Sequence, residues 1–253
     1  MSAARARPAF LAVYPWLRRL AVQRAIPQQV VTFDAGQTLI ELDLCFLARR
    51  VGERGGLIAP AALAAATPAA WVRYDELVDR GANHVAGWKG LMTALLQGGG
   101  ISEPGDLVDW LWQENSRMNL WRKPIAGMVD LARELAGRAV RVAVMSNSEG
   151  TLAELLHEVG IADAFEVIVD SGKIGMEKPH RAIFDHTLAT LGVTGGDPIH
   201  IGDSWNADVA GARGVGWRAI WYGRRVTPSD DPDVAIARDA AQARAALVRW
   251  GVL

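Results

Sequence analysis

Short runs of apolar and β-branched residues recur along the chain and predict the strands of a buried sheet. These runs are VVTF (30 to 33), VRVAVM (140 to 145), FEVIV (165 to 169), PIHI (198 to 201) and RAIWY (218 to 222). Between them, apolar residues recur three and four positions apart, the spacing of a helix with one buried face. Strands that alternate with helices predict an α/β fold with a Rossmann-like parallel sheet, covered by helices on both faces.

The alternation of strands and helices breaks after the first predicted strand. The predicted helices on either side of the later strands are IAGMVDLARELAG (125 to 137), EGTLAELLHEVG (149 to 160) and HRAIFDHTLATLG (180 to 192), each ending in glycine, as helices often do. Residues 41–123 instead carry alanine-rich and tryptophan-bearing helical patterns without a convincing buried strand. We therefore predict an α/β core of residues 29–40 and 124–253 and an inserted all-helical cap domain of residues 41–123. The cap would lie over the carboxyl ends of the strands, where open α/β sheets bind ligands.

Composition narrows the function classes. The 253 residues are 50% hydrophobic and carry a net charge of −1, which does not favour a mainly electrostatic grip on nucleic acid. A small-molecule partner is expected instead, and composition predicts no oligomeric state. The single cysteine, Cys45, cannot form an internal disulfide and predicts a cytoplasmic protein; we expect its side chain to be buried.

The first 28 residues differ from the rest because they hold five arginines and no acidic residue. Pro15 interrupts their apolar stretch, which argues against a secretory signal and against stable membrane insertion. We predict that residues 1–28 form an N-terminal extension with a short helix docked on the body, in preference to a targeting segment.

Polar residues that suit phosphoryl transfer follow the predicted strands. Asp34 ends the first strand, Ser146-Asn147-Ser148 follows the second, Lys178 opens the helix after the third, and GDSWNAD (202 to 208) follows the fourth. A carboxylate that attacks, a hydroxyl beside exposed amides, a lysine and an acidic pair together provide positioning and charge neutralisation for a phosphoryl group. An all-oxygen site with few carboxylates suits Mg²⁺. Taken singly, Ser146 or Asp208 would more commonly cap a helix, and it is their joint placement that favours the catalytic interpretation.

Four motifs in this order resemble the haloacid dehalogenase (HAD) superfamily of aspartate-nucleophile hydrolases with a helical, C1-type cap. The motifs are FDAGQTL, VMSNS, GMEKPHRAIFDHTL and IHIGDSWNADVAGARGVGWRAIWY, and the resemblance covers nearly all of residues 29–250. It implies a phosphatase that forms an aspartyl-phosphate intermediate on a small phosphorylated molecule. The implied roles are Asp34 as nucleophile and metal ligand, Ser146 and the Asn147 amide as phosphoryl ligands, Lys178 as the neutralising cation, and Asp203, Asp208 and the Gly36 carbonyl in the Mg²⁺ site.

Position 36 departs from the pattern of phosphatases in this superfamily, which carry a second aspartate two residues after the nucleophile as general acid and base. Here that residue is Gly36, and Gln37 replaces the usual glycine, while Thr38 and Leu39 stay in register. The missing acid is expected to slow protonation of the leaving group, a contribution typically worth ~10²–10⁴-fold. The sequence therefore predicts an atypical phosphatase that is slow or uses a good leaving group.

Two other readings stay open. A phosphonate hydrolase of the same fold would use a cap lysine as a Schiff base, and Lys89 is the candidate, although a surface position is the commoner explanation for it. A catalytically weak binding or regulatory protein could use the fold as a scaffold. A dehalogenase is disfavoured because the family's dehalogenases lack the Gly202-Asp203 pair.

Aromatic and imidazole side chains complete the candidates. We expect most cap tryptophans to form its core and one or two to line a substrate pocket, with Trp205 of the metal loop as a further candidate. We expect the five histidines to be structural or on the surface, because none has a partner at metal-ligand spacing. The tryptophans of the predicted cap are Trp71, Trp88, Trp110, Trp112 and Trp121, and the histidines are His84, His157, His180, His186 and His200.

Overall fold

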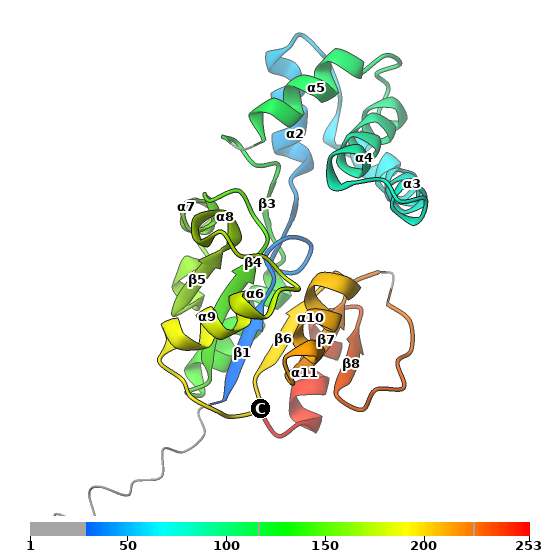
Figure 1. The fold of residues 1–253 in the computed structure, drawn as a ribbon. Helices are drawn as coiled ribbons and strands as arrows, with labels where there is room; N and C mark the ends of the chain where they lie inside the picture. The colour runs from blue at the N-terminus through cyan, green and yellow to red at the C-terminus, as the bar shows by residue number, and fades with distance from the viewer. Residues whose placement is uncertain (1–28, 116, 225) are drawn as a thin grey trace, which may run out of the picture.

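A computed structural model describes residues 29–115, 117–224 and 226–253. The predicted docked helix of residues 1–28 lies outside the described residues. The strands of the larger sheet are β1 (Val30–Phe33), β4 (Arg141–Ser146), β5 (Val167–Asp170), β6 (Ile199–Gly202), β7 (Arg218–Tyr222) and β8 (Val234–Ala237). They pair in the order β5-β4-β1-β6-β7-β8, and every pair is parallel (Figure 1).

The α/β prediction is confirmed, and five strands lie where the apolar runs predicted them. The sixth, β8, was not predicted, because its sequence VAIA is short and half alanine. The connecting helices are α6 (Ala126–Gly137), α7 (Leu152–Glu158), the 3₁₀ turn η1 (Ala162–Ala164), α8 (Ser171–Ile174), α9 (Arg181–Leu191), the π-helical turn η2 (Trp205–Ala210), α10 (Gly211–Gly214) and α11 (Ala240–Arg249). Gly160 and Gly192 take the left-handed conformation after their helices, whereas α6 ends through Ala139, at φ 59°, rather than through Gly137.

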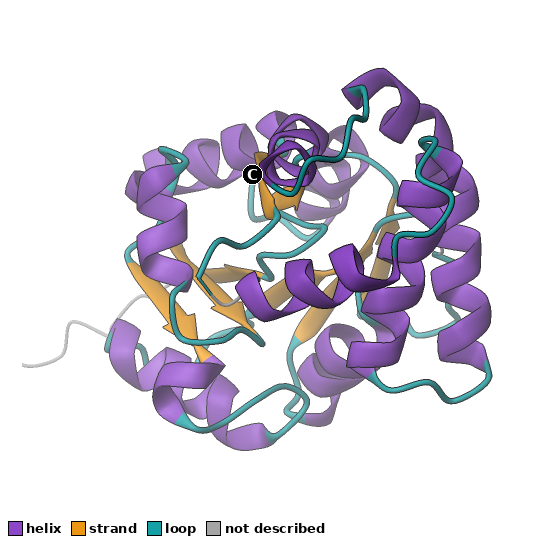
Figure 2. Ribbon diagram, turned by 90° about the horizontal axis from the view of Figure 1, so that it is seen from above, coloured by secondary structure: helices purple, strands orange, loops and turns teal. Residues whose placement is uncertain are grey.

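The two faces of the sheet bury different residues of the same strands. In β4, Val142 and Val144 pack with α6, α7 and α11, whereas Ala143 and Met145 belong to clusters on the face covered by α9 and α10. This alternation arises because successive side chains of a strand point to opposite faces of the sheet. Both faces are buried, so the sequence of the strand is continuously apolar. Helices therefore cover both faces, as Figure 2 shows from above.

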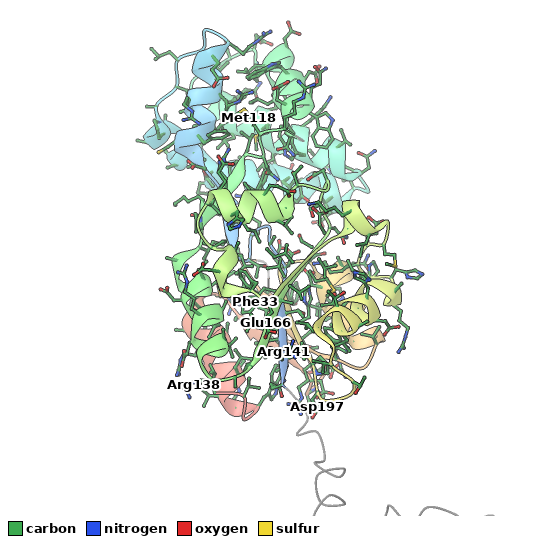
Figure 3. All side chains as sticks on the ribbon, turned by 90° about the vertical axis from the view of Figure 1, so that its left-hand side faces the viewer. Phe33, Met118, Arg138, Arg141, Glu166 and Asp197 are labelled. Atoms are coloured by element: carbon green, nitrogen blue, oxygen red, sulfur yellow. The ribbon has the colours of Figure 1, made fainter. Side chains whose placement is uncertain are left out.

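The segment after β1 forms a helical insertion beyond the carboxyl ends of the strands (Figures 1 and 3). Its helices are α2 (Leu44–Glu53), α3 (Pro60–Asp79), α4 (His84–Gly98) and α5 (Gly105–Glu114). Two short antiparallel strands, β2 (Ile40–Leu42) and β3 (Trp121–Pro124), join the insertion to the sheet. The insertion has a hydrophobic cluster of its own, centred on residues such as Leu47, Leu63 and Leu96. The exact division into core and cap at residues 41 and 123 stays a prediction.

Two further features bear on the predictions. Within the described part of the chain, no helix combines the length and the apolar character needed to span a membrane. Cys45, which we expected to be buried, is exposed on α2, because its position faces away from the cluster that buries Phe46 and Leu47.

Candidate active site

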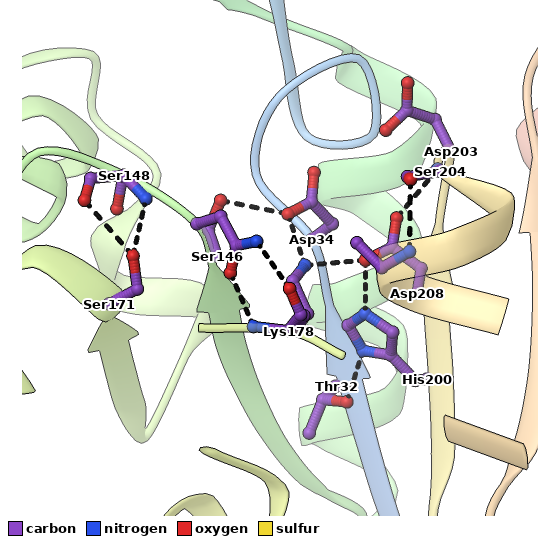
Figure 4. Close-up of polar contacts among 12 residues, drawn as sticks. Thr32, Asp34, Ser146, Ser148, Ser171, Lys178, His200, Asp203, Ser204 and Asp208 are labelled. Atoms are coloured by element: carbon purple, nitrogen blue, oxygen red, sulfur yellow. Dashed lines mark hydrogen bonds and ion pairs between the residues drawn. The ribbon is translucent and has the colours of Figure 1, made fainter. Parts of the chain in front are cut away.

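The parallel sheet brings the predicted site residues together at the carboxyl ends of its strands, because β4, β1 and β6 are neighbours and run in the same direction. Asp34 directly follows β1, Ser146 ends β4, and Asp203 directly follows β6. The chain crosses from β5 back to β6 on the other side of β1. The carboxyl end of β1 is therefore also the switch point at which open α/β sheets form their ligand crevice. Figure 4 shows Asp34 at its centre.

Lys178 links two of the carboxylates. Its Nζ lies 2.6 Å from Asp34 Oδ1 and 2.6 Å from Asp208 Oδ1, and its side chain is 1% exposed. Burial alone would lower the pKa of Lys178, but the attraction of Asp208 and Asp34 outweighs it and holds that pKa above its ordinary value. Lys178 is therefore a buried cation at neutral pH.

Asp34 has a second partner in Ser146, whose Oγ donates to Asp34 Oδ1 at 2.9 Å. Burial raises the pKa of Asp34, and the Lys178 charge opposes that rise. Neither Ser146 nor Asp208 caps a helix: Thr151 precedes α7, and Asp208 lies inside η2. The commoner structural role for these two residues is thus not the one that they take here.

A pair of amide contacts fixes the lysine relative to β4. The Asn147 side chain donates to the Lys178 carbonyl at 2.9 Å and accepts from the Lys178 N–H at 2.8 Å. The side chain of Asn147 is therefore engaged in positioning Lys178, which leaves only its backbone for the predicted phosphoryl contact.

Asp170 is a positioning residue that the sequence analysis missed. Its carboxylate accepts from the backbone N–H groups of Gly150, Gly172 and Leu152 at 2.9 to 3.0 Å, and only 3% of the residue is exposed. These contacts hold the loop that follows Ser146. The signal was available, because Asp170 ends β5 as Asp34 follows β1.

His200 is a second residue whose contact was not predicted. As expected it is structural, but its Nε2 lies 3.0 Å from Asp208 Oδ1 and its Nδ1 lies 2.7 Å from Thr32 Oγ1. Burial lowers the pKa of His200, while Lys178 and His200 hold the pKa of Asp208 well below its usual range despite its own burial. A neutral ring must therefore donate from Nε2 to the ionised Asp208 and accept from Thr32 at Nδ1.

Gly202 makes the close approach of Asp208 possible. A Cβ at position 202 would lie 2.2 Å from Asp208 Cγ, closer than any side chain tolerates. Asp208 also accepts from the Ser204 N–H at 2.8 Å, through Oδ2. The glycine and this amide together set the orientation of the Asp208 carboxylate.

The donor set fits a hard divalent cation. One oxygen from each of Asp34, Asp203 and Asp208 lies within 4.8 Å of the others. Desolvation, followed by the negative charges of Asp34 and Asp208, raises the pKa of Asp203 well above its usual range, although its side chain reaches solvent. A cation would remove this repulsion, and an all-carboxylate set with an open side suits Mg²⁺, which keeps several waters.

A cavity of about 360 Å³ opens between the carboxyl ends of the strands and the helical insertion. At one end lie Asp34, Ser146, Lys178 and Asp203, and the insertion and its connections contribute Trp71, Tyr74, Trp88, Leu91, Asn115, Asn119 and Trp121. Of the expected candidates, Trp110 and Trp112 do not line it. Trp205 does not either, because it lies against Trp221 with ring centroids 4.8 Å apart.

Two residues decide between the alternative chemistries. Lys89 does not line the cavity, and its Nζ pairs with Asp109 at 2.7 Å on the surface of the insertion. Gly36 does line the cavity, and a Cβ built there would meet only Asp34 Oδ2, at 4.0 Å. The position of the missing acid is thus open space beside the nucleophile candidate.

Comparisons with known proteins identify the family of the chain. The family model described as haloacid dehalogenase-like hydrolase matches residues 28–216. The chain is 30% identical over 182 residues to a phosphoserine phosphatase of Thermus thermophilus, covering 68% of this chain and 70% of that protein. It is 29% identical over 147 residues to a ribulose-1,5-bisphosphate 5-phosphatase of Halopiger xanaduensis, covering 56% of this chain and 58% of that one.

Solved structures share the fold. The magnesium-bound HAD-hydrolase YfnB of Bacillus subtilis matches with a TM-score of 0.60 at 20% identity, covering 87% of this chain and 98% of that one. A HAD phosphatase of Thermococcus onnurineus matches with a TM-score of 0.51 at 20% identity, covering 87% and 97%. With the family model spanning most of the sequence, the chain belongs to the haloacid dehalogenase-like hydrolases.

Proposed function

We propose that the protein is a Mg²⁺-dependent phosphatase that acts on a small phosphorylated molecule through an intermediate on Asp34. The observation that carries this proposal is the buried contact of Lys178 with both Asp34 and Asp208, at one end of a cavity large enough for a small ligand. A carboxylate held at the base of a pocket beside a fixed cation is positioned to attack a phosphoryl group and to have its transferred charge neutralised. Phosphatases among the relatives support the same reaction.

In the first step, an Asp34 oxygen attacks phosphorus and the bond to the leaving oxygen breaks, which gives an acyl phosphate. In the second, a water oxygen attacks phosphorus, inorganic phosphate leaves and the carboxylate is restored. Ser146 and Lys178 would contact the phosphoryl oxygens during both steps. Because residue 36 is glycine, no side chain at that position supplies the leaving group's proton or removes one from the water.

Asp34, Asp203 and the Gly36 carbonyl would hold the metal, and Asp208 would steady its surroundings and Lys178. When bound, the cation supplies further neutralisation of the phosphoryl oxygens. The protein's part is to keep Asp34 ionised and aimed at phosphorus, and both Lys178 and the Asp208 network serve that end.

The alternatives have less support. A Schiff base on Lys89 requires that side chain to face the cavity, but it is paired with Asp109 elsewhere. A non-catalytic scaffold stays a candidate because of Gly36, and the experiment below separates it from an enzyme.

Two variants test the proposal. Asp34→Asn keeps the shape of the side chain but removes the attacking oxyanion, so hydrolysis of any phosphate ester should fall to background. Asp203→Ala should abolish the rise in melting temperature that Mg²⁺ produces, because a ligand that binds only the folded state stabilises it by mass action. The matched control is Asp197→Ala, an exposed aspartate at the opposite, amino-terminal end of the strands (Figure 3), which should keep the full Mg²⁺ effect. Turnover by Asp34→Asn, or an unchanged Mg²⁺ effect in Asp203→Ala, would contradict the proposal.

A further inference from the structure

The cavity has two chemically different ends, and the far end contains information about the substrate. The end next to Asp34 is polar and charged. The far end, formed by the helical insertion and its connections, is dominated by Trp71, Tyr74, Trp88 and Trp121. Whatever follows the phosphoryl group in a substrate must fit this second environment.

The aromatic side chains of the far end form two groups of touching rings. Trp71 meets Tyr74 edge to face with centroids 5.3 Å apart, and Trp88 lies 6.4 Å from Trp121 with the planes tilted by 42°. Arg224 lies over the Trp71 ring, 4.5 Å from its centroid, but does not itself line the cavity. Such rings favour another ring by offset or edge-to-face contact.

Charge along the wall argues against a second anionic group on the substrate. Among the described residues that line the cavity, Lys178 is the only cation, and its ammonium already contacts Asp34 and Asp208. Apart from the three aspartates at the phosphoryl end, the remaining charged residue in the wall is Glu149, which is negative. A carboxylate or second phosphate would therefore lose water without gaining a counter-ion.

Uncharged polar groups of a substrate, by contrast, would find hydrogen-bonding atoms without a partner in the cavity wall. Asn115 Oδ1 and Trp88 Nε1 are buried without a hydrogen-bond partner, and the two residues are 8% and 3% exposed. One atom accepts and the other donates, and both residues line the cavity, so the pair matches a hydroxyl or a carbonyl group on a ligand held there.

The open space at Gly36 restricts the leaving group independently of the far end. Without a general acid at position 36, the leaving oxygen departs as an anion. A phenol has a pKa of ~10, as in tyrosine, whereas the pKa of a simple alcohol is closer to that of water, ~15.7. A phenolic oxygen is therefore a leaving group that this site can release unaided, whereas the oxygen of a simple alcohol is not.

Both lines of argument lead to one substrate class. We propose that the site acts on aryl phosphate monoesters, in which the phosphoryl group sits on a phenolic oxygen of an uncharged ring held by Trp71, Trp88 and Trp121. The inference rests on the proposed phosphatase function and adds the substrate class to it.

The test compares kcat/KM with Mg²⁺ across matched esters. 2-Naphthyl phosphate and phenyl phosphate carry an uncharged ring and a phenolic leaving group, 4-carboxyphenyl phosphate adds a charge, and benzyl phosphate replaces the phenol by an alcohol. Acetyl phosphate has a good leaving group but no ring. We expect the uncharged aryl esters to exceed the 4-carboxyphenyl ester by about tenfold or more, because its carboxylate would be buried unpaired, and to exceed benzyl phosphate by a wider margin.

Trp71→Leu tests the ring contact. The ratio of kcat/KM for 2-naphthyl phosphate to that for acetyl phosphate should fall by about 2- to 12-fold, the range expected for one aromatic pair. Trp110→Leu is the matched control, since Trp110 is a half-buried tryptophan of the same insertion that contacts Arg50 outside the cavity. Its ratio should not change.

The possible failures are distinguishable. Hydrolysis of acetyl phosphate with no preference for uncharged aryl esters, or an unchanged ratio in Trp71→Leu, would overturn the aryl assignment and leave the phosphatase proposal standing. Inactivity towards every ester, acetyl phosphate included, would overturn both.

Discussion

Restoring a carboxylic acid at position 36 is the sharpest test of how this site works. Gly36 does not have a positive φ, so its backbone accepts a side chain, and a new Cβ would lie 4.0 Å from Asp34 Oδ2 with no closer neighbour. Gly36→Asp should therefore fold and place its carboxyl beside the nucleophile. Gln37 holds φ at 56°, a region that favours glycine, so Gln37→Gly removes a source of crowding and strain from the same loop.

The expected gain follows from the chemistry of the leaving group. General acid-base catalysis is typically worth ~10²–10⁴-fold, and the lower end, about 10²-fold, corresponds to about 2.7 kcal/mol of the barrier. The nearby carboxylates of Asp34 and Asp208 should raise the pKa of the new acid and so keep a larger fraction protonated near neutral pH. Benzyl phosphate, whose leaving alcohol needs a proton, should gain about 10²-fold, whereas phenyl phosphate should gain little.

The assay is kcat/KM for both esters in wild type, Gly36→Asp and the double variant with Gln37→Gly. Gly36→Asn is the control, because it fills the same space without a titratable proton, and it should give no gain. Equal gains on the two esters, or the same gain from Gly36→Asn, would refute the acid role. A double variant that folds but hydrolyses neither ester nor acetyl phosphate would favour the scaffold reading.

Three further outcomes are expected. Lys178→Ala should bring phosphatase activity close to background and lower the free energy of unfolding in urea by about 3–5 kcal/mol, because Asp34 and Asp208 would lose their buried counter-ion. An unchanged free energy of unfolding would show that the ion pairs of Lys178 with these two carboxylates are not buried in solution. Gly202→Ala should destabilise the fold by about 1–3 kcal/mol and weaken Mg²⁺-dependent stabilisation, since the new Cβ displaces Asp208, whereas Gly137→Ala, whose Cβ meets nothing within 4 Å, should not. Without metal at neutral pH, Asp34→Asn should raise the melting temperature, because a carboxyl with a raised folded-state pKa opposes folding once it is ionised. The difference in melting temperature between the variant and wild type should shrink as pH falls below the unfolded-state pKa of ~3.9, where Asp34 is protonated in both states. A difference that grows towards acid pH would contradict the direction of the pKa shift.

The strand ends were predictable because burial and chemistry change abruptly there. A short run that is apolar on both faces, as in β1 or β4, indicates a strand covered on both sides. The first polar residue after the run then lies at the carboxyl end of that strand. Asp34, Ser146 and Asp203 were located in this way. The cavity tryptophans were not, because helical spacing does not say which part of an aromatic cluster faces a ligand.

Contacts made across the fold were beyond sequence reasoning. His200 meets Asp208 because η2 turns the chain back towards β6, and Asn147 meets the Lys178 backbone across a separation of 31 residues. Neither spacing matches a repeating local pattern such as the three- or four-residue period of a helix face. Asp170 differs, because it could have been found by applying the strand-end rule to β5.

The cost of the charge cluster bears on the choice between an enzyme and a scaffold. Burial alone disfavours Asp34, Asp208 and Lys178 in their charged forms, and a core of apolar side chains at the same place is often as stable or more so. The cluster is nevertheless supported by Ser146, by the Ser204 amide and by His200 with Thr32 behind it. These supports orient Asp34 towards the cavity rather than towards the interior. A fold used only for binding has no need of a carboxylate whose ionisation opposes folding, whereas a nucleophile must be charged, desolvated and fixed in direction. Gly36 then limits which esters the nucleophile can cleave and leaves the attack itself intact, which is why we expect the protein to hydrolyse esters whose leaving groups need no proton.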